Sequence, residues 1–407
     1  MRRGLLSDYF EWAAVKRLSA VEADPERSHQ HEFAGGHLRK MFGDEDRLEF
    51  PARFIWLSDE QEGISEDGKL SWYDSRRKNP DRSAEYRLYY FDNGVTSLMK
   101  EGDSFFVAAR RDGSTMVIIT PEGSTIESQL AWLFGIEGNG ESFESTEITE
   151  DESFRLDFAA RYILDEIGID AEEPETDVLD TILEKCGNKF PATHDFSKMA
   201  RESLPEVSAM DDADHILMTW LEREELLFRR MERHIVSERL KTGFVAADTA
   251  DVDGFIAFSL SVQNRRKSRA GYSLEHHLTA LFKARGIKFE RGVETENRNK
   301  PDFLFPGQNE YRDAAFDTAK LTMLGAKSTC KDRWRQVLSE ATRIQHKHLV
   351  TLEPGITENQ TDEMKAKHLQ LVVPVAIHDT YKPSQQEWLM GVADFVELVK
   401  SRQVGDS

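Results

Sequence analysis

The chain has 407 residues, enough for two or three domains, and its 39% hydrophobic and 10% aromatic content is that of a globular protein. No run is apolar enough for a signal peptide or a membrane span, and two cysteines, Cys186 and Cys330, exclude a disulfide framework, so we expect a cytoplasmic protein. The net charge of −21 argues against a nucleic-acid-binding protein unless the basic residues are concentrated in one region.

Residues 1–120 are predicted to be rich in β-strands. Short apolar or aromatic runs separated by Gly, Asp, Asn and Pro are typical of a small barrel or sandwich. These runs are LEFPARFIWL, EYRLYYF, DSFFVAARR and STMVIIT.

Between the early strands lies SWYDSRRKNPDRSAEYR, in which cations alternate with aromatic residues. Such a segment can contact phosphates with its cations and pack aromatic rings on bases or sugars. A solvated hairpin loop accounts for the same residues equally well. The cations are Arg76, Arg77, Lys78, Arg82 and Arg87.

An acidic segment follows. Residues 138–154 are polar and lack apolar periodicity, which favours a linker. The wider stretch from Glu137 to Lys185 contains 17 acidic and 3 basic residues. The segment can solvate a linker or mask a basic surface, and it contains one short helical pattern, FAARYILDEIGI. We therefore predict a first domain over 1–140, an acidic linker over 141–188 and a second domain over 189–407.

Within the second domain, the segment DDADHILMTWLEREELLFRRMERHIVSERL is predicted to form a long amphipathic helix. Its apolar stripe, best explained as a packing face, consists of Ile216, Trp220, Leu227, Met231 and Ile235.

Helices and strands then alternate, which predicts an α/β domain with a mixed sheet. The first element is a helix, SLEHHLTALFKARG, capped by Ser273 and ended by Gly286. After it come strands IKFERGVE, PDFLF and LTMLGAK, helix DRWRQVLSEATRIQHKH, and strands HLVTL and LQLVVPVAI.

This part of the chain is basic. From Ser261 to Val350 there are 18 Lys and Arg against 10 Asp and Glu, so the acidic net charge arises elsewhere. Within it, NRRKSRAG (264–271) is either a solvated loop or a clamp for DNA phosphates. Its cations are Arg265, Arg266, Lys267 and Arg269.

The segment 301–334 has the outline of a metal-dependent nuclease site. Hydrolysis of a phosphodiester requires a metal such as Mg²⁺, which prefers oxygen ligands. Asp302, at the start of a predicted strand, is a candidate ligand, and Lys327, at the end of the next, can hold the attacking water or the scissile phosphate. A Pro-Asp pair with a lysine about 25 residues later also occurs by chance in many chains. On that alternative interpretation, Asp302 is only a turn residue at the edge of a strand.

A second carboxylate is expected two residues before Lys327, where Gly325 stands. We infer that Glu340 supplies it from the following helix, because at about 100° per residue it borders that helix's apolar stripe. Arg333 lies two turns earlier on the same side, about 10 Å away. Glu275 is a fourth candidate in a supporting role, or else a surface residue near a helix start.

The run Lys331, Asp332 and Arg333 has the chemistry of a G·C reader. Lys and Arg donate to guanine O6 and N7, and Asp accepts from cytosine N4 in the major groove. A charged helix N-terminus is the alternative.

Three strings in this half resemble the EcoRII family of restriction endonucleases: NRRKSRAGYSLE, KPDFLFP and KSTCKDRWRQVLSEA. The similarity continues through LVVP and covers about the last 200 residues, and weaker similarity reaches the N-terminal VKRLSA, HQ and WYDSR. The resemblance implies a PD-(D/E)xK nuclease domain in which the acid has moved to the next helix. It assigns catalysis to Asp302, Lys327 and Glu340, support to Glu275, metal binding to Asp302 and Glu340, and base recognition to Lys331, Asp332 and Arg333.

The family also implies an all-β N-terminal pseudobarrel, similar to the DNA-binding domain of certain plant transcription factors. In that family the pseudobarrel binds a second copy of the target DNA as an allosteric effector, and it blocks the nuclease until this effector is bound. His29, His31, Arg76, Arg82 and Arg87 fall in its DNA-binding segments, although the loop ADPERSHQHEFAGG departs from the pattern. The implied partners are Mg²⁺, a target such as CC(A/T)GG, a second copy in a homodimer, and a DNA methyltransferase of the same system. A DNA-binding regulator with an inactive nuclease domain and a structure-specific repair nuclease are the alternatives.

Overall fold

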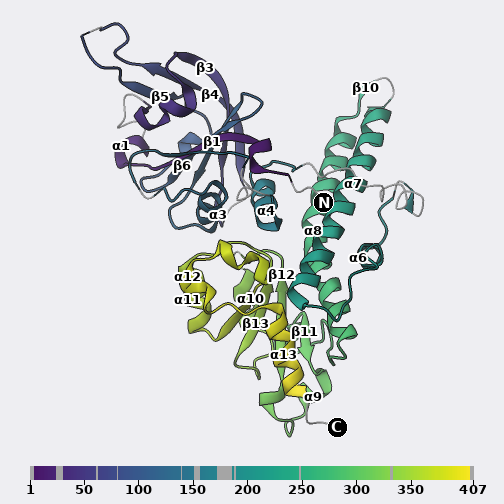
Figure 1. Cartoon of the computed structure of the whole chain (residues 1–407). Coiled ribbons are helices and arrows are strands. Elements are labelled where there is room, and N and C mark those ends of the chain that lie inside the picture. Colours follow the sequence, from purple (N-terminus) through teal and green to yellow (C-terminus); the bar gives the residue numbers. More distant parts are fainter. Residues whose placement is uncertain are drawn as a thin grey trace. The chain divides into compact units, whose positions relative to one another are not determined.

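The computed structural model describes residues 4–23, 31–60, 63–79, 81–138, 140–150, 156–171, 186–187, 189–246, 249–330 and 333–403. The chain divides into two compact units (Figure 1). The N-terminal unit comprises residues 1–174 and 354–357, and the C-terminal unit comprises 175–353 and 358–407.

The N-terminal unit is built on one eight-stranded sheet in the order β2-β5-β4-β3-β7-β6-β1-β8. Strands β3 and β7 are parallel, and every other neighbouring pair is antiparallel. The strands are β1 (Phe10–Arg17), β2 (Glu32–Ala34), β3 (Arg47–Trp56), β4 (Ile64–Asp74), β5 (Tyr86–Tyr90), β6 (Ser104–Arg110), β7 (Thr115–Thr120) and β8 (Glu144–Glu147).

Both faces of this sheet are covered. Phe54 and Ile55 are adjacent on β3 but belong to different buried clusters, as the alternation of side chains along a strand requires. Helices α3 (Thr125–Phe134) and α4 (Phe158–Glu166) contribute to the cluster that contains Ile55. The β-rich prediction therefore agrees with the structure, but the unit is not all-β. Its shorter helices are η1 (Leu6–Asp8), α1 (Ala20–Ala23), η2 (Gly36–Leu38), α2 (Arg39–Phe42) and η3 (Thr96–Leu98).

The predicted boundary near residue 140 differs from this division. Strand β8 pairs with β1, and α4 buries Ile163 and Leu164, so both elements belong to the N-terminal unit. The acidic composition obscured these apolar positions, because charged residues occupy the exposed sides of the same elements. Within the predicted linker, residues 151–155, 172–185 and 188 lie outside the described residues.

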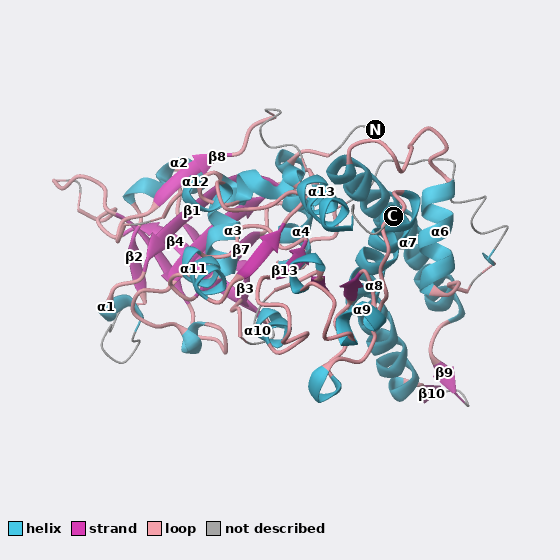
Figure 2. Cartoon of the chain, turned by 90° about the horizontal axis from the view of Figure 1, so that it is seen from below, coloured by secondary structure: helices cyan, strands magenta, loops and turns pink. Residues whose placement is uncertain are grey.

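The C-terminal unit begins, in its described part, with helices α6 (Thr193–Glu202), α7 (Ala213–Thr242) and α8 (Val252–Ala284). Helices α7 and α8 lie side by side, joined by β9 (Val245–Ala246) and β10 (Thr249–Ala250) (Figure 2). The predicted packing stripe of α7 is buried from Ile216 to Met231, both fully inaccessible, whereas Ile235 is only partly buried. The predicted cap at Ser273 is wrong, since Ser273 is a buried residue in the interior of α8.

The predicted mixed sheet is present, in the order β11-β12-β13-β14. Strand β11 (Phe303–Phe305) is antiparallel to β12 (Thr322–Lys327), and β13 (Lys347–Thr351) and β14 (Leu369–Val372) continue in parallel. The predicted strand IKFERGVE is reduced to one bridge, between Glu290 and Leu304. The other elements are η5 (Glu296–Arg298), α9 (Gln308–Arg312), η6 (Thr318–Lys320), α10 (Trp334–Leu338), α11 (Glu358–Ala366), η8 (Val375–Thr380), α12 (Pro383–Gln386) and α13 (Val392–Gln403).

Aromatic rings fix this sheet against its helices. Phe282 of α8 makes edge contacts with Phe303 and Phe305 of β11, and Phe305 in turn meets Phe395 of α13. The strand that follows Asp302 is therefore held in a rigid core. None of the helices in the described residues is long and apolar enough to cross a membrane.

Candidate active site

Asp302 and Lys327 meet at one end of the β11–β12 pair. Lys327 Nζ donates to Asp302 Oδ2 at 2.7 Å, and the Ala326 backbone N–H donates to the same oxygen at 2.7 Å. Both side chains are largely buried, with 18% of Asp302 and 15% of Lys327 exposed. The antiparallel register brings the two residues together. Phe303 pairs with Leu324, so Asp302, which precedes Phe303, lies beside the residues that follow Leu324 on β12.

Gly325 has no room for a carboxylate. A methyl group added there would lie 2.9 Å from Cγ2 and 3.2 Å from Cγ1 of Val337, on helix α10. An acid at this strand position would thus displace the helix that packs on it. The packing explains why the second carboxylate has to come from another element.

Glu340 follows α10 and is half-buried near the Asp302–Lys327 pair. Burial, with a further contribution from the negative charge of Asp302, raises the pKa of Glu340 to about 7. Within the described residues, its buried Oε2 atom has no hydrogen-bond partner. The structure thus places Glu340 where it interacts electrostatically with both Asp302 and Lys327.

Glu275 of α8 also belongs to this cluster. Burial and the charge of Asp302 raise the pKa of Glu275, and Arg291 pairs with its Oε2 atom. Because a guanidinium occupies this carboxylate, Glu275 fits the supporting role predicted for it better than that of a metal ligand.

The carboxylates fit a hard divalent cation. Across the described ranges, no group of three or more His, Cys, Asp and Glu side chains is arranged to hold a metal. Mg²⁺ does not need such a group, because it retains several water ligands and binds through one or two carboxylates. Asp302, together with the buried and unpartnered oxygen of Glu340, provides that donor set.

The predicted helix over 332–348 is much shorter in the structure. Helix α10 spans five residues, and Glu340 lies beyond its end, next to Ala341 with a φ of +46°. Arg333 is exposed at the N-terminus of α10, so Arg333 and Glu340 do not share one helix as predicted. Lys331 and Asp332, predicted to read bases, lie outside the described residues.

The basic run 264–271 is helical rather than a loop. Arg269 is buried, pairs with Glu225 of α7 and lies 4.3 Å from the Phe228 ring centroid. Arg266 pairs with Glu232 at 2.6 Å. These two guanidiniums join α8 to α7. The phosphate role stays a prediction for all four cations of the run, including Arg265 on the same helix.

The predicted effector-binding cations of the N-terminal unit lie on or near the β4–β5 connection. Arg76 and Arg87 both pair with Glu85. Arg77 pairs with Asp46, 2.7 Å away. Lys78 and Arg82 are exposed on the same connection.

Of the two predicted histidines, His31 stacks on Tyr90 at a centroid distance of 5.2 Å, and its Nδ1 lies 3.3 Å from Asp92. His29 lies outside the described residues. His31 thus lies at the Tyr90 end of β5, whereas the cations of the β4–β5 connection lie at its Tyr86 end, and several of them have acidic partners.

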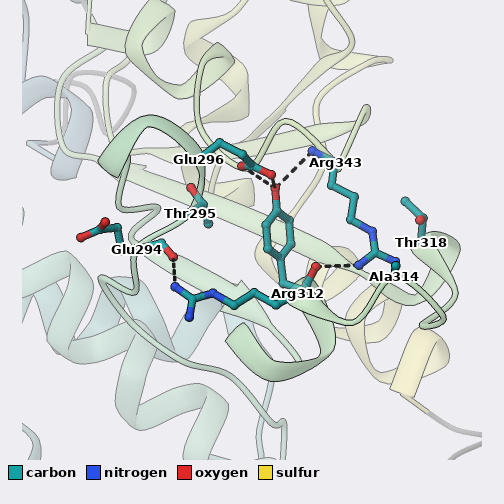
Figure 3. Close-up of a pocket in the computed structure, with 8 residues that line it drawn as sticks. Glu294, Thr295, Glu296, Arg312, Ala314, Thr318 and Arg343 are labelled. Atoms are coloured by element: carbon teal, nitrogen blue, oxygen red, sulfur yellow. Dashed lines mark hydrogen bonds between the residues drawn. The ribbon is translucent and has the colours of Figure 1, made fainter.

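One group of residues near Glu340 was not predicted. A cavity of about 550 Å³ lies beside the segment 339–343, and Figure 3 shows Glu296 and Arg343 in hydrogen-bond contact with the Tyr311 hydroxyl at its wall. No periodicity marks these residues, because they lie in short or irregular elements. The cavity is lined by Glu294, Thr295, Glu296, Tyr311, Arg312, Ala314, Thr318 and Arg343.

Comparison with known proteins locates this site in a recognised domain. Residues 228–396 match the family model described as EcoRII C terminal. The chain is 42% identical over 190 residues to the type II restriction enzyme EcoRII of Escherichia coli, which is 45% of this chain and 47% of that enzyme. The chain thus spans about half the length of this curated relative.

Two solved structures are more distantly similar. Metal-depleted Ecl18kI in complex with uncleaved DNA gives a TM-score of 0.45 at 17% identity, over 56% of this chain and 86% of that chain. A complex of the restriction endonuclease PspGI with substrate DNA gives a TM-score of 0.44 at 15% sequence identity. The match covers 57% of this chain and 98% of that chain. The family match covers Asp302, Lys327 and Glu340 together. The resemblance inferred from the sequence strings is confirmed, because residues 228–396 match the EcoRII C-terminal family model.

Proposed function

We propose that the chain is a type II restriction endonuclease that cleaves double-stranded DNA at a short G·C-flanked site such as CC(A/T)GG. The observation that supports this most strongly is the cluster of Asp302, Lys327 and Glu340 inside the segment that matches the EcoRII C-terminal model. The proposal includes a cytoplasmic homodimer, because two equivalent sites would cut the two strands of a palindrome, and a methyltransferase that protects the host DNA.

Asp302 and Glu340 would hold Mg²⁺, which would neutralise the charge that develops on the phosphate and activate water. Lys327 has three N–H donors and uses one on Asp302, so the others can hold the attacking water or the scissile phosphate. Glu275 and Arg291 would keep this end of the sheet polar and ordered.

Digestion of a sequenced plasmid with Mg²⁺, followed by mapping of the ends, tests this function. Cuts confined to one short sequence would support it. Cuts that follow DNA structure would identify a repair nuclease, and binding to a duplex with one CC(A/T)GG site without cleavage would identify a regulator.

We predict that Arg333→Ala weakens specific binding by about 1–3 kcal/mol and relaxes discrimination at one G·C pair, because a bidentate guanine contact contributes that much. Competition binding with single-base variants of the target measures both effects. Arg335→Ala is a matched control, since Arg335 is also exposed and pairs with Glu363 at 3.0 Å. Equal weakening on all sequences would assign Arg333 to a phosphate instead.

The N-terminal unit would bind a second target site and inhibit the nuclease until it does so. A fragment that begins near Lys189 should then cut a single-site DNA faster than the full chain, and added target oligonucleotide should stimulate only the full chain. Rates measured side by side on one-site DNA test this. If the two rates are equal and the oligonucleotide has no effect, the regulatory role is lost and the nuclease assignment remains.

A further inference from the structure

Glu340 lies in an irregular segment, 339–343, between α10 and β13. It belongs neither to a strand, where neighbouring ladders would fix its backbone, nor to a helix. The next residue, Ala341, is fully buried and has a φ of +46°, a conformation that L-residues other than Asn and Asp rarely adopt without support. Other groups must therefore hold this segment in place.

Tyr311 and Glu296 supply the first set of contacts. The Tyr311 hydroxyl donates to the Glu296 carboxylate at 2.7 Å, and it also lies 3.2 Å from the Arg343 backbone N–H, from which it accepts (Figure 3). Glu296 additionally accepts from the Thr342 backbone N–H at 3.3 Å. Two consecutive backbone N–H groups immediately after Ala341 are thus bound by one tyrosine–glutamate pair.

Two further side chains hold the rest of the segment. Asn299 Nδ2 donates to the carbonyl of Ser339 at 2.8 Å, directly before Glu340. Lys347 Nζ, which is buried, donates to the carbonyl of Ala341 at 3.4 Å and to that of Ile344, just beyond the segment, at 2.7 Å. The backbone is therefore held on both sides of Glu340, so a shift on either side would move its carboxylate.

The cavity beside these residues is less suited to a ligand than its size suggests. The Arg343 guanidinium donates to the carbonyls of Tyr311 and Asp313 at 2.6 and 2.7 Å. Arg312 donates to the carbonyl of Glu294 at 3.2 Å. Since both arginines bind the surrounding backbone, the wall acts as scaffolding around the segment that carries Glu340.

We propose that Tyr311 and Glu296 are positioning residues that hold the Glu340 carboxylate in the geometry needed for metal binding. The inference rests on the proposed metal-dependent cleavage. The pair touches neither DNA nor metal in this scheme, and it acts through the backbone of Thr342 and Arg343. Groups that orient metal ligands in this way typically change metal affinity or activity by about 10–100-fold when they are removed.

The test uses the full chain and Mn²⁺, which prefers the same oxygen ligands as Mg²⁺. Tyr311→Phe removes only the hydroxyl. We expect Mn²⁺ affinity, followed by the electron paramagnetic resonance signal of the free ion, to fall by about 10-fold or more, with a similar fall in kcat and an unchanged KM for DNA. Tyr381→Phe is the matched control, because Tyr381 is also buried and donates to a backbone carbonyl, that of Glu353, at 2.6 Å.

A second pair of variants separates positioning from folding. Glu296→Gln keeps an oxygen acceptor and should retain more Mn²⁺ affinity than Glu296→Ala, at similar melting temperatures. If Tyr311→Phe binds Mn²⁺ as tightly as Tyr381→Phe does, or if the two Glu296 variants lose stability without losing Mn²⁺ affinity, the positioning role is wrong. A wild-type chain that cleaves no DNA would instead overturn the proposed function, which makes the two failures distinguishable.

Discussion

Asp302→Ala is expected to abolish cleavage while leaving sequence-specific DNA binding intact. The carboxylate accepts from Lys327 and from the Ala326 backbone, and its proposed role is to bind the metal rather than to read a base. Its removal would take away one of two proposed metal ligands and leave the Lys327 ammonium without its acidic partner. We expect the rate to fall by at least about 10³-fold, or roughly 4 kcal/mol in the barrier.

Single-turnover cleavage and binding in Ca²⁺ measure these two properties separately. Asp362→Ala is a suitable control, because Asp362 is 70% exposed on α11 and pairs only peripherally with Lys365, at 3.4 Å. Cleavage near the wild-type rate in Asp302→Ala would remove the site assignment. Loss of specific binding together with cleavage would mean that Asp302 supports the recognition surface.

The sequence predicted the elements that carry the site better than it predicted their ends. Strands β11 and β12 are marked by local apolar patterns, so Asp302 and Lys327 could be placed at their termini. The helix after Lys327 was extended too far, because Ala341 and Ile344 continue the apolar spacing of α10. In the structure Ala341 and Ile344 are buried, but they belong to a separate segment beyond the end of α10. Tertiary contacts, rather than local apolar spacing, therefore set where the helix ends.

Local sequence patterns could not predict side-chain contacts between residues that are far apart in the chain. Arg266 and Arg269 look like a solvated basic run until α7 brings Glu232 and Glu225 against them. The Tyr311–Glu296 contact joins residues 15 apart that lie in the short helices α9 and η5, on either side of strand β11, and such short elements carry no readable periodicity. Glu340 was found for a different reason. The chemistry required an acid that Gly325 does not provide, and the helix predicted over 332–348 would set Glu340 beside its apolar stripe. Helix α10 ends before Glu340, yet the carboxylate still interacts with Asp302.

Glu340→Gln is expected to abolish cleavage and, in the metal-free chain, to stabilise the fold at high pH. The amide cannot provide the carboxylate charge that Mg²⁺ requires, so activity should be lost as in Asp302→Ala. Gly325→Glu should not rescue it, because a side chain at that position would collide with Val337.

The stability effect follows from the pKa of Glu340, which burial and Asp302 raise from 4.5 to about 7. An acid whose pKa is higher in the folded chain favours folding below its unfolded pKa, and this contribution is lost as the pH rises through the folded pKa. The wild type should therefore lose stability between about pH 4.5 and 7, whereas Gln stays neutral. Since Glu340 is only half-buried, we expect a difference of about 1–2 kcal/mol at pH 8.

Urea unfolding in EDTA at pH 5 and pH 8 measures this difference. The exposed variant Glu387→Gln should show the same pH dependence as the wild type. If Glu340→Gln gains nothing at pH 8, Glu340 is not under the strain that its burial beside Asp302 implies. If it also cleaves normally, the second carboxylate lies elsewhere and Glu275 is the next residue to test. Stabilisation combined with lost cleavage would instead show that the fold accepts a buried charge at this position because the reaction needs it.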